Sequence, residues 1–384
     1  MCSISPFSIP HIVDSICDHL NLDDIYNCKK VCKDWSDVFA PYEWRSLHMA
    51  TEYDHKGPSS PEKRNLILKH AHRTESLTIR QDDIWLLQSS CLNFKRLIYV
   101  HVIFILDSFG VYPLTHISLL QDLSHCAELR LAYPGHSRYY PQTTNDAVVV
   151  AMALSDCPPN VESLHVSYYN AGYPGKTHTP QNHPSSFILP WEPLSLRKFL
   201  FDCAITCSFQ GLTNIGLIPF LKNCCPLLED LSLPSFPEED CEALMKTIGA
   251  HCPKLQYLRL NDDDIGVSPF GSEIDHFVYI TQPLKFLKID LDYRHDTTVL
   301  EPLRRNGSDA LEALEFRNTA EYDLSEYIPP YDWFPNLKTV NYHKSDSEGL
   351  EVHLWTRPLE ITANDDRHRE DVREYYTSIV NMSH

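Results

Sequence analysis

The sequence predicts an α/β fold in which a short all-helical module precedes a solenoid of strand and helix repeats. Three observations support this prediction: apolar residues at helical spacing between Ile9 and Leu47, a strand motif that recurs with leucines at fixed offsets, and a repeat length near 27 residues. In such a solenoid the parallel strands line the concave face and the helices lie on the convex face. We divide the chain into a helical module at 1–48, a linker at 49–65, repeats at 66–358, and a C-terminal capping segment or tail at 359–384.

The composition is that of a folded, acidic protein. With 43% hydrophobic and 11% aromatic residues in 384 positions, the chain can bury one large core or a small domain beside a larger one. The net charge of −19 repels nucleic acid and anionic membranes, and the lysines and arginines are scattered along the chain. We therefore expect a protein ligand, with no nucleic acid and no membrane as partner.

The N-terminus and the cysteine usage indicate an intracellular chain. Met1 to Pro10 contains no basic residue and no extended apolar stretch, so no secretory signal is expected. The longest apolar run, Leu97 to Leu106, is too short to span a bilayer and suits a buried strand. An odd count of 13 cysteines fits a reducing compartment, where disulfides are not expected. We expect the chain in the cytoplasm, the nucleus or both.

Two amphipathic helices are predicted at the N-terminus, because apolar residues recur every three or four positions. The first stripe comprises Ile9, Ile12, Val13, Ile16 and Leu20, and the second comprises Ile25, Cys28, Val31, Cys32 and Trp35. Ser8 can cap the first helix, since Pro10 is tolerated in a first turn where its missing N–H is not needed. The following segment, Ala50 to Glu62, is rich in Gly, Pro and Ser and is predicted to be a linker.

From about Leu66 onward one unit recurs: a helical stretch, a stop such as Cys-Pro, and a strand with leucine-like residues at positions one, four and six. The stops at Cys157, Cys225 and Cys252 precede the strands Val161–Val166, Leu228–Leu233 and Leu255–Leu260, and Phe334-Pro335 precedes Leu337–Tyr342. Weaker copies begin at Leu196, Leu284 and Leu311, and an early copy covers Glu128–Leu131. Cys225 and Cys252 are 27 positions apart, inside the roughly 20 to 29 residues of a leucine-rich repeat.

The repeats explain how so many short elements could share one core. A single strand and helix cannot bury their apolar faces, but stacked copies bury them against each other. Helical partners are predicted at Asn145–Ser155, Leu217–Asn223 and Glu238–Ala250. The Pro after each Cys stops the helix and favours extended backbone, which starts the next strand.

The N-terminal residues also resemble a known family. Ile9-Pro10, then Leu20-Asn21-Leu22-Asp23-Asp24-Ile25, then Val31-Cys32-Lys33-Asp34-Trp35 and a closing Trp44 resemble the F-box, in which Leu-Pro and Val-Cys-x-x-Trp stand in the same order. Ile9 and Ile25 occupy positions where that family usually has leucine. The resemblance covers about the first 48 residues, and together with the repeats it is similar to the F-box proteins that carry leucine-rich repeats.

The resemblance implies a non-catalytic receptor subunit of a Skp–cullin–F-box ubiquitin ligase. The helical module would dock on the Skp adaptor, and through it on cullin and RING subunits, while the repeats would bind an unknown substrate protein for ubiquitination and proteasomal degradation. The residues implied in adaptor binding are Ile9, Pro10, Ile12, Ile16, Leu20, Leu22, Ile25, Val31, Cys32, Lys33 and Trp35. The alternative is a repeat scaffold with no ligase attached, whose N-terminal helices only cap the solenoid.

Substrate binding is expected on the concave face, where residues between the ladder leucines point outward. The candidates are His165, Tyr168, Tyr169, Lys198, Asp230, Tyr257, Arg259, Phe286, Lys288, Glu315 and Arg317, with Ser163 and Asn341 at equivalent positions. Tyr and Arg often dominate the energy of protein interfaces, which suits this set. The insertion from Tyr168 to Pro190 is either a ligand-binding loop or a tolerated surface insertion.

No pattern of residues indicates catalysis, a metal or a cofactor. Gly172 to Thr177 has two residues between its glycines where a phosphate-binding loop needs four. Asn261 to Gly266 lacks the acidic residue that would close a calcium loop, since Ser272 stands there. Cys28 and Cys32 with His19, or Cys203 and Cys207, have no second pair to complete a zinc site. We expect no enzyme activity, although an unrecognised site in the Tyr168 insertion is a third hypothesis.

Overall fold

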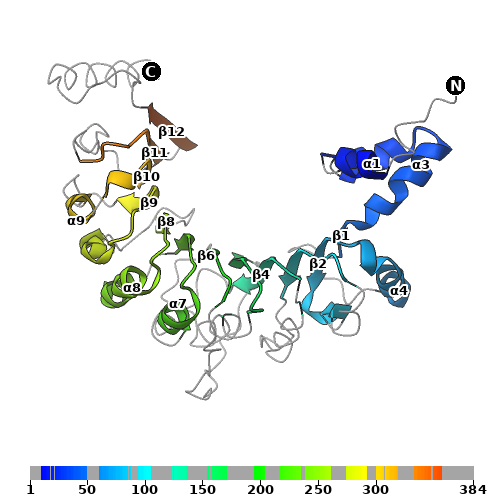
Figure 1. Cartoon of the computed structure of the whole chain (residues 1–384), viewed down its shortest axis with the longest axis horizontal. Helices are drawn as coiled ribbons and strands as arrows, with labels where there is room; N and C mark the ends of the chain where they lie inside the picture. The colour runs from blue at the N-terminus through cyan, green and yellow to red at the C-terminus, as the bar shows by residue number, and fades with distance from the viewer. Residues whose placement is uncertain are drawn as a thin grey trace.

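The computed structural model is a curved solenoid built on one 12-stranded sheet in which the order of strands in space is their order in sequence (Figure 1). The structure describes residues 10–17, 19–20, 22–49, 60–84, 86–87, 94–104, 123, 125–135, 154, 157–170, 194–203, 216–234, 238–260, 274–291, 300–306, 308–318, 333–346 and 349–356. The remaining residues, including 359–384 and most of the 168–190 insertion, lie outside this description.

The sheet is parallel from its first strand to its eleventh. Its parallel strands are β1 (Ser46–His48), β2 (Ser76–Arg80), β3 (Tyr99–Ile103), β4 (Glu128–Gly135), β5 (Ser163–Asn170), β6 (Lys198–Cys203), β7 (Asp230–Leu233), β8 (Tyr257–Leu260), β9 (Phe286–Leu291), β10 (Ala313–Asn318) and β11 (Thr339–Asp346). The last strand, β12 (Gly349–Thr356), pairs antiparallel with β11. This arrangement confirms the predicted solenoid of parallel strands, which is of the leucine-rich-repeat type.

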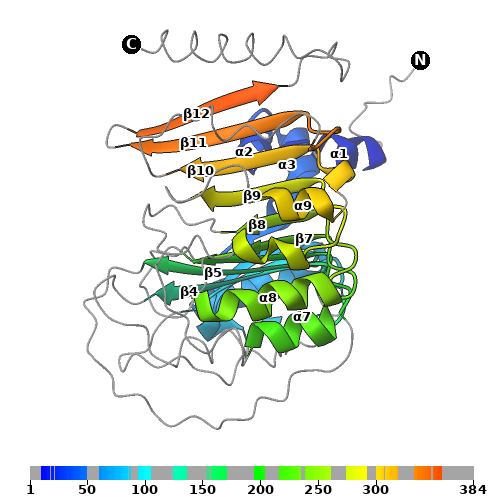
Figure 2. The ribbon, with the colours of Figure 1, turned by 90° about the vertical axis from the view of Figure 1, so that its left-hand side faces the viewer.

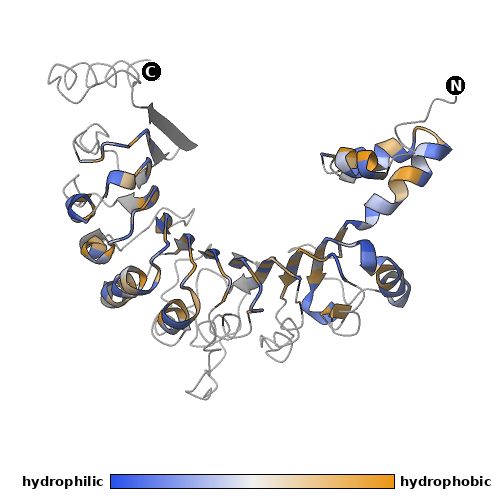
Figure 3. Ribbon diagram, in the orientation of Figure 1, coloured by the Kyte–Doolittle hydropathy of each residue, from blue (hydrophilic) through white to orange (hydrophobic). Residues whose placement is uncertain are grey.

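Helices cover the convex side of the sheet (Figures 1 and 2). They are α4 (Pro61–His70), α7 (Ile218–Cys224), α8 (Glu238–His251) and α9 (Glu301–Arg305), with 3-10 turns η3 (Ala71–Arg73), η4 (Gln81–Asp83), η7 (Ile274–Tyr279) and η9 (Ser308–Ala310). The predictions at 217–223 and 238–250 are confirmed within one residue, whereas 145–155 lies outside the described residues except for Leu154. In Figure 3 these helices carry both hydrophobic and hydrophilic residues, as expected for helices with one buried side.

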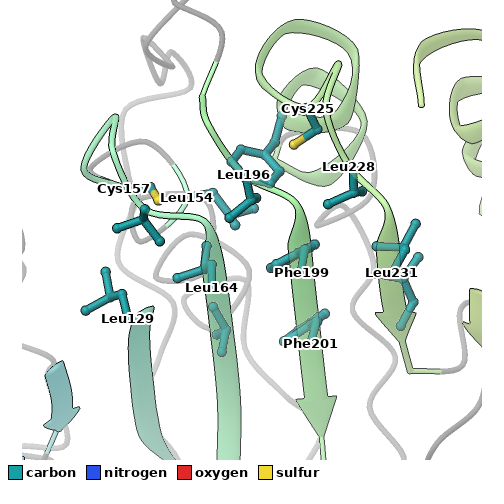
Figure 4. Packing of buried hydrophobic residues seen from close by; sticks show 14 of the residues in the cluster. Leu129, Leu154, Cys157, Leu164, Leu196, Phe199, Phe201, Cys225, Leu228 and Leu231 are labelled. Atoms are coloured by element: carbon teal, nitrogen blue, oxygen red, sulfur yellow. The ribbon is translucent and has the colours of Figure 1, made fainter. Parts of the chain in front are cut away.

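The ladder residues of neighbouring strands meet in register inside the solenoid (Figure 4). Leu129, Leu164, Phe199 and Leu231 form one fully buried row, because each is the register partner of the next. Cys157, Cys225 and Cys252 are also buried beside this core, and burial raises the pKa of the Cys252 thiol to about 12. The Cys-Pro stop is a tight turn, since the N–H of Leu228 donates to the Cys225 carbonyl. The cysteines whose side chains the structure describes are free thiols.

A backbone hydrogen bond to the preceding repeat comes just before each parallel strand from β2 to β11. The N–H of Glu229 donates to the Arg197 carbonyl at 2.7 Å, Gln256 donates to Glu229 at 2.9 Å, and Lys285 donates to Gln256 at 2.8 Å. The side chains of some of these residues form ion pairs between repeats: Arg197 Nη1 lies 2.8 Å from Glu229 Oε1. The backbone hydrogen bonds therefore hold neighbouring repeats in register, and each exposed ion pair adds at most about 1 kcal/mol to the stability.

The N-terminal module consists of α1 (Pro10–Cys17), α2 (Leu22–Lys29), α3 (Lys33–Phe39) and the 3-10 helix η2 (Ala40–Trp44). Its core is separate from that of the repeats: Val13, Cys17, Ile25 and Phe39 are buried together, with Trp35 and other partly buried residues around them. The sequence had placed Ile25 through Trp35 on one apolar stripe. That prediction is wrong at Val31 and Cys32, because the chain turns between α2 and α3 and leaves both exposed.

The module continues directly into the sheet. η2 ends at Trp44 and β1 begins at Ser46, so the first strand of the solenoid precedes the predicted linker at 49–65. Within that range, residues 50–59 lie outside the described residues and α4 begins at Pro61. In the part of the chain that the structure describes, no helix is both long and apolar enough to cross a bilayer.

Candidate functional site

Two surfaces of the described structure are candidates for binding other proteins. The first is the end of α2 and the turn that follows it, on the helical module. Tyr26 is 55% exposed and Val31 is 63% exposed, and the Lys30 ammonium lies 4.0 Å from the centre of the Tyr26 ring. Cys32 and Lys33 are also exposed. Covering an apolar side chain as exposed as Val31 with a partner protein is favourable, because apolar surface is removed from water.

The other residues implied in adaptor binding have different environments. Ile25 is buried in the core of the module, and Ile12, Ile16, Leu20 and Trp35 are half-buried, the last three at the edge of that core. Pro10 and Leu22 lie in α1 and α2, but their side chains are not described, and Ile9 lies outside the described residues. The structure therefore gathers Val31, Cys32 and Lys33 on the surface, while Ile25 supports the module from inside.

The second surface is the concave face of the sheet. One row of register partners runs Ser163, Lys198, Asp230, Tyr257 and Phe286, and a second includes Arg259, Lys288, Glu315 and Asn341. His165 belongs to the same second row, separated from Arg259 by Leu200 and Ser232. The structure thus places these sequence candidates side by side. Tyr168, Tyr169 and Arg317 lie in β5 and β10, but their side chains are not described.

In the C-terminal half of this face the charged side chains compensate each other. Asp230 forms an ion pair with Arg259, and its Oδ2 lies 3.8 Å from Lys198 Nζ. Lys288 Nζ lies 3.0 Å from Glu315 Oε1. Tyr257 and Phe286 form an aromatic pair with ring centres 6.4 Å apart, and the Arg259 guanidinium lies 5.3 Å from the Phe286 ring. This half offers an aromatic, charge-balanced surface.

In the N-terminal half the same face carries nitrogen-bearing side chains that sequence reasoning missed. His48, His101 and Arg130 stand in the row that continues to His165. Burial, together with the charge of Arg130, lowers the pKa of His101 to about 4 and that of His165 to about 4. The sequence signal for them is their position between ladder residues, Arg130 in the early copy Glu128–Leu131 and His101 in the run after Leu97.

A polar cavity of about 310 Å³ lies where the module meets the first repeats. It is lined by Asp14, Pro41, Tyr42, Arg45, Arg73, Glu75 and Arg96. The Tyr42 hydroxyl donates to Asp14, and Arg45 and Arg96 both pair with Glu75. Of these pairs, that of Arg45 with Glu75 connects the end of the module to the solenoid. Within the described ranges no group of three or more His, Cys, Asp or Glu side chains is arranged to hold a metal ion.

The comparison with known proteins identifies no family for this chain. No family model matches it, and no curated protein matches it. Among solved structures, the leucine-rich repeat-containing protein LegL7 from Legionella pneumophila is similar over 80% of this chain and 92% of that chain, with 13% sequence identity and a TM-score of 0.40.

Proposed function

We propose that this protein is the substrate-recognition subunit of a Skp–cullin–F-box ubiquitin ligase. The observation that carries the proposal is that the F-box-like order from Pro10 to Trp44 coincides with a separate helical module, whose Val31-Cys32 turn is exposed. The module docks on the Skp adaptor, which connects it to the cullin and RING subunits. The concave face of the repeats binds the target.

The exposed turn supports docking through its chemistry. Covering an exposed valine side chain contributes about 1.5 kcal/mol or more, and Tyr26 adds an amphipathic ring one turn earlier. Because Ile25, Phe39 and Val13 are packed inside, the module keeps its shape while Val31 remains available to a partner. This combination of a formed core and an exposed apolar turn suits a preformed docking surface.

The proposed role needs no catalytic residue in this chain. Holding a target beside the ubiquitin-transferring subunits raises its effective concentration there, which accelerates transfer without new chemistry. The continuous path from η2 into β1 supports this role, since it fixes the module at one end of the sheet that carries the concave face.

A repeat scaffold with no ligase attached is the second candidate. It is favoured by the direct packing of the module on the first repeat, where the Arg45 carbonyl accepts hydrogen bonds from the N–H groups of Glu75 and Ser76. Terminal repeats of a solenoid need a cap, and η2 lies at that end of the sheet, directly before β1.

Co-purification with the Skp adaptor separates the two candidates. Wild type is compared with Val31→Asp, and Val278→Asp on η7 is the matched control because Val278 is also an exposed valine, far from the module in sequence. We expect wild type and Val278→Asp to bind alike and Val31→Asp to bind at least about tenfold more weakly, since 1.4 kcal/mol is a factor of ten. Equal binding by Val31→Asp would remove the role of this turn. If the folded wild type does not bind the Skp adaptor, the ligase role is excluded and the repeat scaffold remains as the candidate function.

A further inference from the structure

The strands β1 to β5 bring basic side chains into a single row on the concave face. His48, Thr78, His101, Arg130 and His165 are successive register partners. Neighbouring strands are about 4.8 Å apart, so side chains in this row stand next to each other on the same face. We call His101, Arg130 and His165 the basic row.

Buried polar atoms in the basic row and beside it lack a hydrogen bond. His101 is 8% exposed, and its Nε2 atom has no hydrogen-bond partner. Ser167, two residues after His165 on the same strand, is 5% exposed, and its Oγ atom has no partner either. Leaving such an atom unsatisfied is unfavourable, so a ligand that forms a hydrogen bond with it recovers free energy.

Three cations and two carboxylates lie at or beside the basic row, when Arg130 itself is counted. The charged and titratable groups facing it from β1, β2, β4 and β6 are His48, Arg80, Glu128, Lys198 and Asp202. The two carboxylates are exposed, and Asp202 Oδ2 lies 3.9 Å from His165 Nε2. Two of these cations also have carboxylate partners, since Arg80 Nη2 lies 3.7 Å from Asp82 Oδ2 and Lys198 Nζ lies 3.8 Å from Asp230 Oδ2.

We propose that the basic row is a binding site for an oxyanion of the target, either a carboxylate or a phosphate group. The Arg130 guanidinium supplies charge and a planar set of donors, and the imidazoles of His101 and His165 supply one donor each on either side. That the oxyanion belongs to a ligase target rests on the proposed function, whereas oxyanion binding itself can be tested without any ligase.

Binding is coupled to proton uptake. With pKa values of about 4, His101 and His165 are neutral at pH 7 in the free protein. An oxyanion beside them favours the imidazolium form and offsets both burial and the charge of Arg130, so their pKa values rise on binding. Affinity for the oxyanion therefore increases as the pH falls from 7 towards 5, because the complex binds more protons than the free protein.

The test uses the full chain with ¹³C-labelled histidines, inorganic phosphate and acetate as separate probes, and chloride at equal ionic strength as reference. We expect one probe or both to raise the pKa of His101 and His165 by about one unit or more, saturably, while His251 on α8 is unaffected. A response to phosphate alone identifies a phosphate site, and a response to acetate alone identifies a carboxylate site. No response to either at equal ionic strength would overturn the proposal.

Matched variants separate this site from simple ionic strength effects. Arg130→Gln and His101→Gln are expected to abolish the shift at His165, whereas His251→Gln leaves it intact. If Arg130→Gln does not fold, His101→Gln carries the test alone, and a wild-type response in that variant would contradict the site. Because Val31 belongs to a different surface, binding of these variants to the Skp adaptor is unchanged, so failure of the oxyanion site is distinguishable from failure of the ligase role.

Discussion

The indole of Trp44 stacks on the imidazole of His70, with ring centres 3.9 Å apart and planes 7° from parallel. Trp44 ends the helical module and His70 ends α4, the first convex helix. Burial, followed by the neighbouring Lys69, Arg73 and His72, lowers the pKa of His70. Together with the pairing of β1 and β2, this contact fixes the direction of the module relative to the repeats.

Replacement of Trp44 tests this junction. Trp44→Ala is expected to lower the free energy of unfolding by about 2 kcal/mol, because the half-buried indole and its stacking contact with His70 are both lost. Trp44→Phe keeps a ring over His70 and is expected to cost less than about 1 kcal/mol. Urea denaturation measures both. Equal losses in the two variants would show that stacking does not hold the junction.

The leucine ladder gives a second prediction. Leu231 is fully buried in the row of Figure 4, so Leu231→Ala should lower the free energy of unfolding by about 2 to 5 kcal/mol. Leu200 lies on the neighbouring strand β6 but on the concave face, where it is half-buried. Leu200→Ala should lower the free energy of unfolding by about 1 kcal/mol. Thermal unfolding compares the pair. A larger loss of stability in Leu200→Ala than in Leu231→Ala would contradict the assignment of Leu231 to the buried face and Leu200 to the concave face.

Gly249 in α8 gives a prediction whose sign is opposite to helix propensity. Alanine stabilises most helices by about 1 kcal/mol relative to glycine. A Cβ atom at Gly249 would overlap the carbonyl oxygen of Tyr279 and lie 2.9 Å from its carbon, both of which are backbone atoms of η7. Gly249→Ala is therefore expected to destabilise the protein by about 1 to 3 kcal/mol. Circular dichroism during thermal melting decides the sign, and a stabilised variant would exclude this close contact.

Stability should fall on acidification before the carboxylates titrate. An unfolded histidine has a pKa of about 6.5, and that of His101 or His165 in the fold is about 4. Between these values the unfolded chain binds more protons, so the free energy of unfolding decreases as the pH falls from 6.5. We expect a decrease of roughly a few kcal/mol by pH 4.5, measured by urea denaturation. The His101→Gln/His165→Gln variant should show a flatter profile, and an identical slope would exclude these two groups as its cause.

The sequence was sufficient for the periodic parts of this structure. The strand motif after Cys225 and Cys252 repeats with the same offsets, and it places β7 and β8 and their buried leucines correctly. The break between α2 and α3 could not be read in the same way, because Val31 continues an apolar stripe and only the turn shows that it points outward. Alternation along each strand places His101 and Arg130 on the concave face, but their alignment in one row depends on the register of β3, β4 and β5, which the unequal lengths of the early repeats do not reveal.

The binding of full-length wild type to purified Skp adaptor, measured by isothermal titration calorimetry, tests the proposed function most directly. We expect a 1:1 complex with a Kd of about 1 µM or tighter, as for an interface of standard size with a preformed docking surface. The absence of binding heat, with circular dichroism showing that both proteins are folded, would contradict the docking role of the helical module.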